Sequence, residues 1–139
     1  MGDYGAIVST LVRIQHAMDH QDREAFRACW TEDAQVEMVM FDGAKLDFND
    51  RDDLIVRTTG AWTGQAGALR HVVGGVEVTF TDPAAAQATF YCSYIDVGAA
   101  PGFAGLGEYR DDLVKGADGT WRVKRRRQVF LTPPPIRGA

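Results

Sequence analysis

The apolar residues of this chain change their spacing near the middle of the sequence, and this change constrains the fold more than any other feature. Near the start they recur at intervals of four, three and four residues, as on one face of a helix: Ile7, Leu11, Ile14 and Met18. From residue 68 onward, long segments alternate between apolar and polar positions, which is typical of β-strands. Helices that precede a series of antiparallel strands predict an α+β fold, with the helices packed on one face of the sheet.

The expected elements follow from these two periods and from the residues that begin and end them. We expect helices at residues 6–20, 23–30 and 49–62. Asp22 is the expected N-cap of the second helix, and residues 31–33 are the turn that closes it. We expect strands at residues 34–41, 46–48, 68–82, 86–97, 106–115 and 120–131. A glycine-rich loop at residues 98–105 is expected to form a mobile lip over the mouth of a cavity.

The bulk properties exclude several classes of function. The chain has 139 residues, of which 45% are hydrophobic and 24% charged, and we expect residues 1–139 to form one soluble domain. The net charge of -4 argues against nucleic acid or an anionic membrane as the main partner. Because the sequence has no apolar run of membrane-spanning length and no visible secretory signal, we expect a cytoplasmic protein in which Cys29 and Cys92 are free thiols.

A pair of glycines inside the expected strand at 68–82 decides which way a histidine points. The apolar positions before and after the glycines would lie on opposite faces of a regular strand: Leu69 and Val73 before, and Val76, Val78 and Phe80 after. One extra residue, a bulge at Gly74–Gly75, places both groups on one face. His71 shares that face, so we expect its imidazole to point to the concave side of the sheet, which the helices cover.

The last expected strand carries several arginines, and their directions depend on its regularity. Strict alternation gives a solvated face with Arg122, Lys124, Arg126 and Gln128, and an inward face with Trp121, Val123, Arg125, Arg127 and Val129. A buried arginine needs a carboxylate or a ligand, because an unpaired buried charge is very costly. Asp111 is the expected carboxylate partner of Arg125 or Arg127, and a bulge within residues 124–128 would exchange the two faces.

Aromatic, methionine and arginine side chains supply the expected walls of a cavity between helices and sheet. On a concave face, aromatic residues and methionines serve both as core and as substrate contacts. The expected contacts are Tyr94, Trp30, Met38, Phe90, Phe103 and Tyr109, together with Arg125 and Arg127.

Two histidines raise the separate question of a metal site. His16 and His20 have a spacing that can hold zinc, with His71 as the required third ligand. The adjacent glutamate of a protease motif is missing from this segment. We therefore expect solvated or rim-lining imidazoles and no bound metal.

Three stretches of the sequence together resemble a known family: "LVRIQHAMDHQDREAFRACWTEDAQVEM", "LRHVVGGVEVTF" and "GEYRDDLVKGADGTWRVKRR". They are similar to the SnoaL-like group of the nuclear-transport-factor-2-like superfamily, and they occur in the order that this group shows. The resemblance covers most of the chain and implies a cone-shaped α+β fold, in which a curved antiparallel sheet packs against three helices from the N-terminal half and encloses a cavity. Because this fold hosts lyases, isomerases, cyclases, hydrolases and binding modules, the fold alone implies little about function.

Within that superfamily the chain resembles the branch of scytalone dehydratase, bile-acid dehydratase and hexachlorocyclohexane dehydrochlorinase. This resemblance implies an Asp–His dyad, which carries over to Asp19 in "HAMD" and His71 in "LRHVV". Dehydratase-like members often have a tyrosine five residues before this aspartate, where this chain has Ile14, so a mechanism that needs a phenol requires another tyrosine. Asp19 has an alternative interpretation as the residue that ends the first helix and caps the following turn.

The dyad predicts proton-transfer chemistry on a small organic molecule. An imidazole is well suited to act as general base at neutral pH, and a carboxylate on one ring nitrogen fixes its tautomer and stabilises the imidazolium. We therefore expect a cofactor-independent lyase of dehydratase or elimination type, or an isomerase, with a largely apolar substrate and with Tyr94 or an inward arginine stabilising negative charge. Two alternatives remain open: a non-catalytic ligand-binding or association module, and a hydrolase. Relatives commonly cover the convex face of the sheet with a second copy, which implies a homodimer, with a trimer as the alternative.

Overall fold

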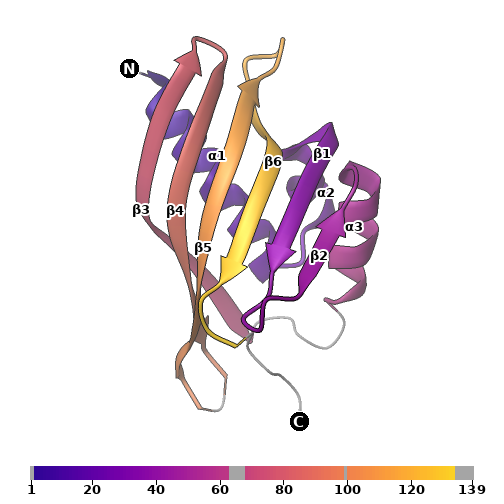
Figure 1. Cartoon of the computed structure of the whole chain (residues 1–139), viewed down its shortest axis with the longest axis vertical. Coiled ribbons are helices and arrows are strands. Elements are labelled where there is room, and N and C mark those ends of the chain that lie inside the picture. Colours follow the sequence, from indigo (N-terminus) through magenta and orange to yellow (C-terminus); the bar gives the residue numbers. More distant parts are fainter. Residues whose placement is uncertain (1, 63–67, 99, 134–139) are drawn as a thin grey trace.

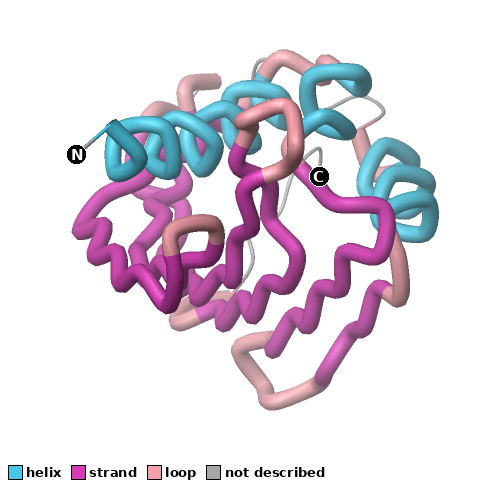
Figure 2. The backbone as a smooth tube through the Cα atoms, turned by 90° about the horizontal axis from the view of Figure 1, so that it is seen from above, coloured by secondary structure: helices cyan, strands magenta, loops and turns pink. Residues whose placement is uncertain are grey.

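The computed structural model of the chain describes residues 2–62, 68–98 and 100–133. Its described elements follow one another as α1 (Gly2–Asp19), α2 (Arg23–Ala28), β1 (Trp30–Val39), β2 (Lys45–Phe48), α3 (Arg51–Gly60), β3 (Leu69–Asp82), β4 (Ala85–Asp96), β5 (Gly102–Lys115) and β6 (Trp121–Phe130). These strands form one sheet in the order β2-β1-β6-β5-β4-β3 (Figure 1). Figure 2 shows the sheet curving beneath the helices, which cover one of its faces. The α+β fold predicted from the sequence is confirmed, and in the described part of the chain no helix is long and apolar enough to cross a membrane.

The end of α1 is fixed by capping groups that the sequence supplies. α1 buries the apolar stripe expected of it, and it ends after Asp19, where Gln21 adopts a left-handed conformation with φ of 53°. The backbone N–H of Asp22 then donates to the carbonyl oxygen of Ala17 at 2.8 Å, which satisfies a carbonyl of the last turn. The side chain of Asp22 caps α2 by accepting from the backbone N–H of Ala25 at 3.1 Å. These contacts hold Asp19 in the last turn of α1.

The glycine pair of β3 forms the bulge that the sequence predicts. Between Gly74 and Glu77, two residues of β3 face a single residue of β4. Gly75 adopts a φ of +63°, which glycine accepts without steric cost. On both sides of the bulge, alternate side chains pack against the core: Leu69, Val73, Val76 and Val78. His71 therefore lies on the inward face of the strand, as expected.

The arginines of β6 do not lie on the faces that the sequence predicts. The register of β5 and β6 shifts at Lys124, which is an extra residue in β6. Beyond this bulge the side chains exchange faces, so Arg126 and Gln128 are buried while Arg125 and Arg127 are exposed. The prediction of Arg125 and Arg127 as inward residues is therefore wrong, because strict alternation fails at Lys124.

Three further features differ from those expected. The second helix stops before Trp30, which already begins β1, and β1 includes the residues expected as a turn. β1 pairs with β6 in parallel, so the described sheet is not antiparallel throughout. Much of the expected loop at 98–105 is strand rather than lip, because β5 begins at Gly102, which pairs with Asp96 of β4. Residue 99 of that expected loop lies outside the described residues.

Candidate functional site

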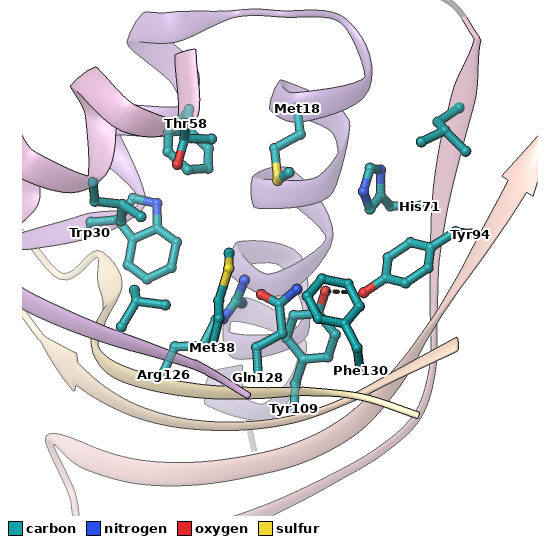
Figure 3. Close-up of a pocket in the computed structure, with 14 residues that line it drawn as sticks. Met18, Trp30, Met38, Thr58, His71, Tyr94, Tyr109, Arg126, Gln128 and Phe130 are labelled. Atoms are coloured by element: carbon teal, nitrogen blue, oxygen red, sulfur yellow. Dashed lines mark hydrogen bonds between the residues drawn. The ribbon is translucent and has the colours of Figure 1, made fainter. Parts of the chain in front are cut away.

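A cavity of about 180 Å³ lies between the helices and the sheet. Much of its wall is apolar and consists of Met18, Phe26, Trp30, Val36, Met38, Leu54, Leu69 and Phe130. Six polar side chains also line it: Thr58, His71, Tyr94, Tyr109, Arg126 and Gln128. Figure 3 shows His71 and Tyr94 on one side of this space, Trp30 on the other, and the side chains of β5 and β6 below. Apolar walls with a few polar groups are typical of sites that bind small molecules.

The structure brings Asp19 and His71 together at one side of the cavity. The imidazole Nδ1 lies 2.6 Å from Asp19 Oδ1, and the backbone N–H of His71 donates to Oδ1 and Oδ2 at 3.2 and 3.1 Å. Because β3 is an edge strand of the described sheet, Asp19 takes the place of a neighbouring strand as acceptor for this N–H. The carboxylate therefore holds both the ring and the strand that carries it.

These contacts determine the tautomer of the His71 ring. Both carboxylate oxygens of Asp19 already accept from the backbone N–H of His71. Asp19 is therefore also the acceptor in the contact with Nδ1, and the ring is the donor. Nε2 is then the nitrogen with the lone pair, and no hydrogen bond to it is found among the described residues. The His71 side chain is 13% exposed and lines the cavity, so Nε2 is available to accept a proton from a ligand.

Asp19 places a buried carboxylate against the Nδ1 side of the His71 ring. The Asp19 side chain is only 3% exposed, and it lies at the C-terminal end of α1, the negative end of the helix dipole. The apolar wall strengthens the attraction between imidazolium and carboxylate, because the local dielectric constant is lower than that of water. This arrangement would stabilise an imidazolium formed by proton transfer from a ligand.

Next to His71, two tyrosine hydroxyls meet on the cavity wall. Tyr94 Oη and Tyr109 Oη lie 2.8 Å apart, and the rings of His71 and Tyr94 pack edge to face with centroids 5.2 Å apart (Figure 3). Burial raises the pKa of both phenols above the ordinary value, and hydrogen bonds from Tyr109 and Gln128 oppose this effect at Tyr94. Both hydroxyls therefore stay protonated at neutral pH and can donate a hydrogen bond. Gly107 leaves the space that they need, since a Cβ there would lie 2.5 Å from Tyr94 Oη.

Arg126 brings a permanent positive charge to the cavity. Its Nε and Nη2 donate to the two carboxylate oxygens of Asp111 at 2.8 and 2.7 Å, and the two side chains are 3% and 0% exposed. The guanidinium also lies 4.9 to 5.6 Å from the ring centroids of Trp30, Phe90 and Tyr109. Burial lowers the pKa of Arg126, but the charge and hydrogen bonds of Asp111 outweigh burial, so the pKa lies above its ordinary value. Asp111 is thus the buried carboxylate that the sequence predicts, with Arg126 as its partner.

Several of the aromatic residues predicted to contact a substrate do lie at the cavity. The structure places four of the predicted contacts on its wall: Trp30, Met38, Tyr94 and Tyr109. Phe90 is buried behind the wall, where it stacks on Tyr109 with ring centroids 4.9 Å apart. Phe90 therefore supports the site and does not line the cavity.

The remaining predicted contacts lie elsewhere. Phe103 is 66% exposed, because it pairs with Ile95, whose side chain lies on the opposite face of β4 from Tyr94. Arg125 and Arg127 lie on the outer face of the sheet, where they donate to side chains of β1. The structure thus corrects three of the predicted substrate contacts, and in each case the register of a strand is the cause.

The histidines and cysteines outside the dyad have other surroundings. His16 and His20 are exposed on α1, with ring centroids 6.5 Å apart. Within the described residues, no group of three or more His, Cys, Asp or Glu side chains is placed to hold a metal ion. Cys29 and Cys92 are buried free thiols, and burial raises the pKa of Cys92 to about 12.

Sequence reasoning missed several polar and apolar residues of the cavity: Arg126, Gln128, Phe130, Leu54 and Thr58. The first three follow the bulge in β6, which reverses the inward positions. The sequence did indicate this change of face at Phe130. In a regular strand, residue 130 lies on the face opposite the buried Trp121, so an apolar residue at 130 indicates a bulge between them. The two residues of α3 reach the cavity only through the tertiary arrangement, for which the sequence has no local signal.

Comparison with known proteins agrees with this architecture. The sequence profile of the SnoaL-like domain matches residues 1–127. An NTF2-like protein with a cystatin-like fold from Novosphingobium aromaticivorans has a TM-score of 0.79 at 22% identity, over 94% of this chain and 82% of that one. ActVI-ORFA from Streptomyces coelicolor has a TM-score of 0.75 at 22% identity, over 91% of this chain and 96% of that one. A protein from Catenulispora acidiphila in complex with S-DNPA has a TM-score of 0.77 at 19% identity, over 93% of each chain. No curated protein is significantly similar in sequence.

Proposed function

This chain belongs to the SnoaL-like domain family, and we propose that it is a cofactor-independent enzyme that moves a proton on a small, largely apolar organic molecule. The reaction class is an elimination, most simply a dehydration, or an isomerisation. The observation that carries this proposal is the 2.6 Å contact between Asp19 and His71, which leaves Nε2 of a cavity-lining imidazole as proton acceptor. A carboxylate-supported imidazole beside an apolar ligand space is an effective general base.

The volume of the cavity limits the size of the substrate. An apolar cavity of about 150 Å³ in another protein accommodates benzene, so the 180 Å³ of this cavity suits a single six-membered ring with small substituents. Trp30, Met18 and Met38 offer flat or adaptable apolar surfaces to such a ring. We therefore propose a substrate with one carbocyclic or aromatic ring.

The proposed reaction begins with transfer of a proton from a substrate carbon to His71 Nε2. The C–H bond breaks, its electron pair forms a double bond to the neighbouring carbon, and the resulting imidazolium is stabilised by Asp19. In an elimination, a leaving group departs from that neighbouring carbon with its own electron pair. In an isomerisation, the neighbouring carbon already has a double bond, whose π pair moves to the next atom, and His71 returns the proton at a different carbon. Tyr94 or Arg126 stabilises negative charge that develops on the ligand.

Hydrogen exchange tests this function before the natural substrate is known. One-ring ketones such as 2-cyclohexen-1-one and cyclohexanone are incubated with the protein in D2O, and NMR follows exchange of their acidic C–H positions. We expect the wild type to accelerate exchange, and His71→Ala and Asp19→Asn to lose this acceleration. His16→Ala, which removes an exposed imidazole from α1, is the matched control. Equal exchange rates in the wild type and in His71→Ala would contradict the proposal.

One contact also favours a second candidate, a non-catalytic ligand-binding module. Asp19 accepts from the backbone N–H of His71, so its carboxylate stabilises the edge strand whether or not the ring reacts. The NMR signals of the His71 ring distinguish the two functions during titration with small carbonyl and phenolic compounds. Ring signals that ignore every compound that binds would favour the module.

We further propose that the protein associates with a second copy of itself through the outer face of the sheet, with a trimer as the alternative. Val72 and Phe103 are 52% and 66% exposed, and their register partners on β4 are Ser93 and Ile95, two residues apart. Exposed apolar side chains that gather on one face are typical of association surfaces. Light scattering is expected to give more than the monomer mass for the wild type and the monomer mass for Val72→Lys combined with Phe103→Lys. A monomeric wild type would overturn this part of the proposal.

A further inference from the structure

The polar side chains of the cavity wall are unevenly distributed. Of the six that line it in the described part of the chain, five come from strands β3 to β6, and one, Thr58, comes from a helix. Figure 3 shows Thr58 above Trp30, across the space from His71 and Tyr94. A ligand that fills the cavity therefore meets polar groups of the sheet on one side and a single hydroxyl of α3 on the other.

Thr58 stands at a position of α3 where an apolar residue is expected. Leu54 and Thr58 are four residues apart, so they share one face of the helix, and both line the cavity. Leu54 is buried in the core, as residues on the inward stripe of an amphipathic helix generally are. The hydroxyl of Thr58 therefore interrupts an apolar stripe, and such an exception to the pattern points to a functional role.

The neighbouring threonine shows what a hydroxyl without a ligand does in this helix. Thr59 Oγ1 donates to the carbonyl oxygen of Ile55 at 2.7 Å, the usual bond of a threonine to the preceding turn. No hydrogen bond of Thr58 Oγ1 is found among the described residues, and this oxygen is not enclosed by protein atoms. The Thr58 hydroxyl is therefore available to a ligand in the cavity.

The surroundings of Thr58 determine which ligand group it can bind. A hydroxyl both donates and accepts hydrogen bonds, so an alcohol or a carbonyl oxygen suits it equally. The other side chains that the helices contribute to the cavity wall are apolar: Met18, Phe26 and Leu54. A charged group beside them would lose its hydration without gaining a counter-charge. The ligand group at Thr58 is therefore a neutral oxygen.

We propose that Thr58 is a specificity-determining residue: its hydroxyl binds a neutral oxygen substituent on the far side of the substrate ring from the carbon that reacts at His71. This inference rests on the proposed function and names the substrate class, a one-ring molecule with a hydroxyl or carbonyl group at each of two opposite positions. Polar contacts on both sides of the cavity fix the direction in which the ring lies. They thereby decide which C–H bond meets His71 Nε2.

Two probes of similar size test this role, 4-hydroxycyclohexanone and 4-methylcyclohexanone. Calorimetry measures both dissociation constants, and the preference is the constant for the methyl compound divided by that for the hydroxyl compound. Thr58→Val keeps the branched shape but removes the hydroxyl, so we expect it to lower this preference about fivefold. Thr58→Ser keeps the hydroxyl and is expected to keep the preference. A residue with only a packing role would give the reverse pattern, because valine preserves its shape and serine does not.

A matched control and a second measurement separate this inference from the proposed function. Thr59→Val removes the hydroxyl that bonds to Ile55, and it is expected to keep the wild-type preference. Cyclohexanone has no substituent for Thr58, so its hydrogen exchange is expected to be equally fast in the wild type and in Thr58→Val. A preference that depends on Thr58, in a wild type that exchanges no ketone, would overturn the proposed function alone. A wild type that exchanges cyclohexanone but binds neither probe, or has the same preference as Thr58→Val, would overturn the role of Thr58 alone.

Discussion

Two acid–base pairs each contribute one side chain, His71 and Arg126, to the wall of the same cavity, and they are built differently. Asp19 and His71 join the end of a helix to an edge strand, and the His71 side chain is 13% exposed. Asp111 and Arg126 join two neighbouring strands inside the sheet, where both side chains are almost completely buried. In the first pair the carboxylate has one ring nitrogen and one backbone N–H as donors, whereas in the second both oxygens are taken by one guanidinium.

This difference separates a pair that can move a proton from a pair that holds a charge. The imidazole of His71 has a second nitrogen, Nε2, that can accept a proton from a ligand. The guanidinium of Arg126 stays protonated, and three aromatic rings surround it. We call Asp19–His71 the variable pair, because its ring can accept a proton from a ligand, and Asp111–Arg126 the constant pair, because its guanidinium keeps its charge. Substitutions in the two pairs test this division.

The variable pair is expected to show the largest effect on activity. In serine proteases, Asp→Asn beside the catalytic histidine lowers turnover about 10⁴-fold, and we expect Asp19→Asn to slow hydrogen exchange by about 10³-fold or more. The asparagine oxygen can still accept from the backbone N–H of His71, so the free energy of unfolding should change little. Exchange rates and urea denaturation of the same samples measure both quantities. A variant that unfolds easily but retains its exchange rate would show that Asp19 is structural.

The constant pair is expected to dominate stability. Asp111→Ala leaves the buried charge of Arg126 without a partner, which typically costs about 3–5 kcal/mol in free energy of unfolding. Asp111→Leu combined with Arg126→Met removes both charges and is expected to recover most of this loss. Urea denaturation of the single and double variants measures the difference. If the double variant is as unstable as Asp111→Ala, the loss comes from packing and not from the unpaired charge.

Cys92 lies near both pairs and provides a pH-dependent test. Burial raises the pKa of its thiol from 9.0 to about 12, with Arg126 lowering it and Asp19 raising it by smaller amounts. A raised pKa in the folded state gives stability that is present below pH 9 and lost as pH rises toward 12, because the unfolded thiol ionises first. Between pH 8 and 10 the wild type should lose about 1.4 kcal/mol more than Cys92→Ala. Equal pH slopes for the two proteins would show that the thiol ionises as easily in the folded chain.

The sequence predicted the variable pair better than the constant one, for physical reasons. The face of His71 followed from a local rule, since two adjacent glycines indicate a bulge and a bulge fixes the parity of the strand. The pairing of Asp19 with His71 came from the family resemblance, because the approach of a helix end to an edge strand depends on the whole fold. The predicted partner of Asp111, Arg125 or Arg127, lies one residue away from the actual partner, Arg126. The sequence did not reveal this because no glycine marks the bulge at Lys124.

The parallel pairing of β1 with β6 illustrates the limit of such local rules. The six matched pairs of this ladder begin at Trp30 with Val123, and the register shifts before Gln35. Residues so distant in sequence carry no turn or spacing signal that relates them. Trp30 was therefore predicted as a cavity residue from its residue type alone. Its position opposite His71 in Figure 3 arises from the pairing of β1 with β6.

A third ion pair, on the outer face of the sheet, gives the smallest expected effect and completes the comparison. Arg127 Nε donates to Glu37 Oε1 at 3.0 Å, a geometry close to that of the buried pairs, but the side chains are 53% and 36% exposed. Water solvates both charges when the pair is broken, so Glu37→Gln should change the free energy of unfolding by less than about 1 kcal/mol, and less still at high salt. Urea denaturation at low and high salt, alongside Asp111→Ala, measures both changes. A loss as large as that of Asp111→Ala would mean that burial does not separate the structural roles of these pairs.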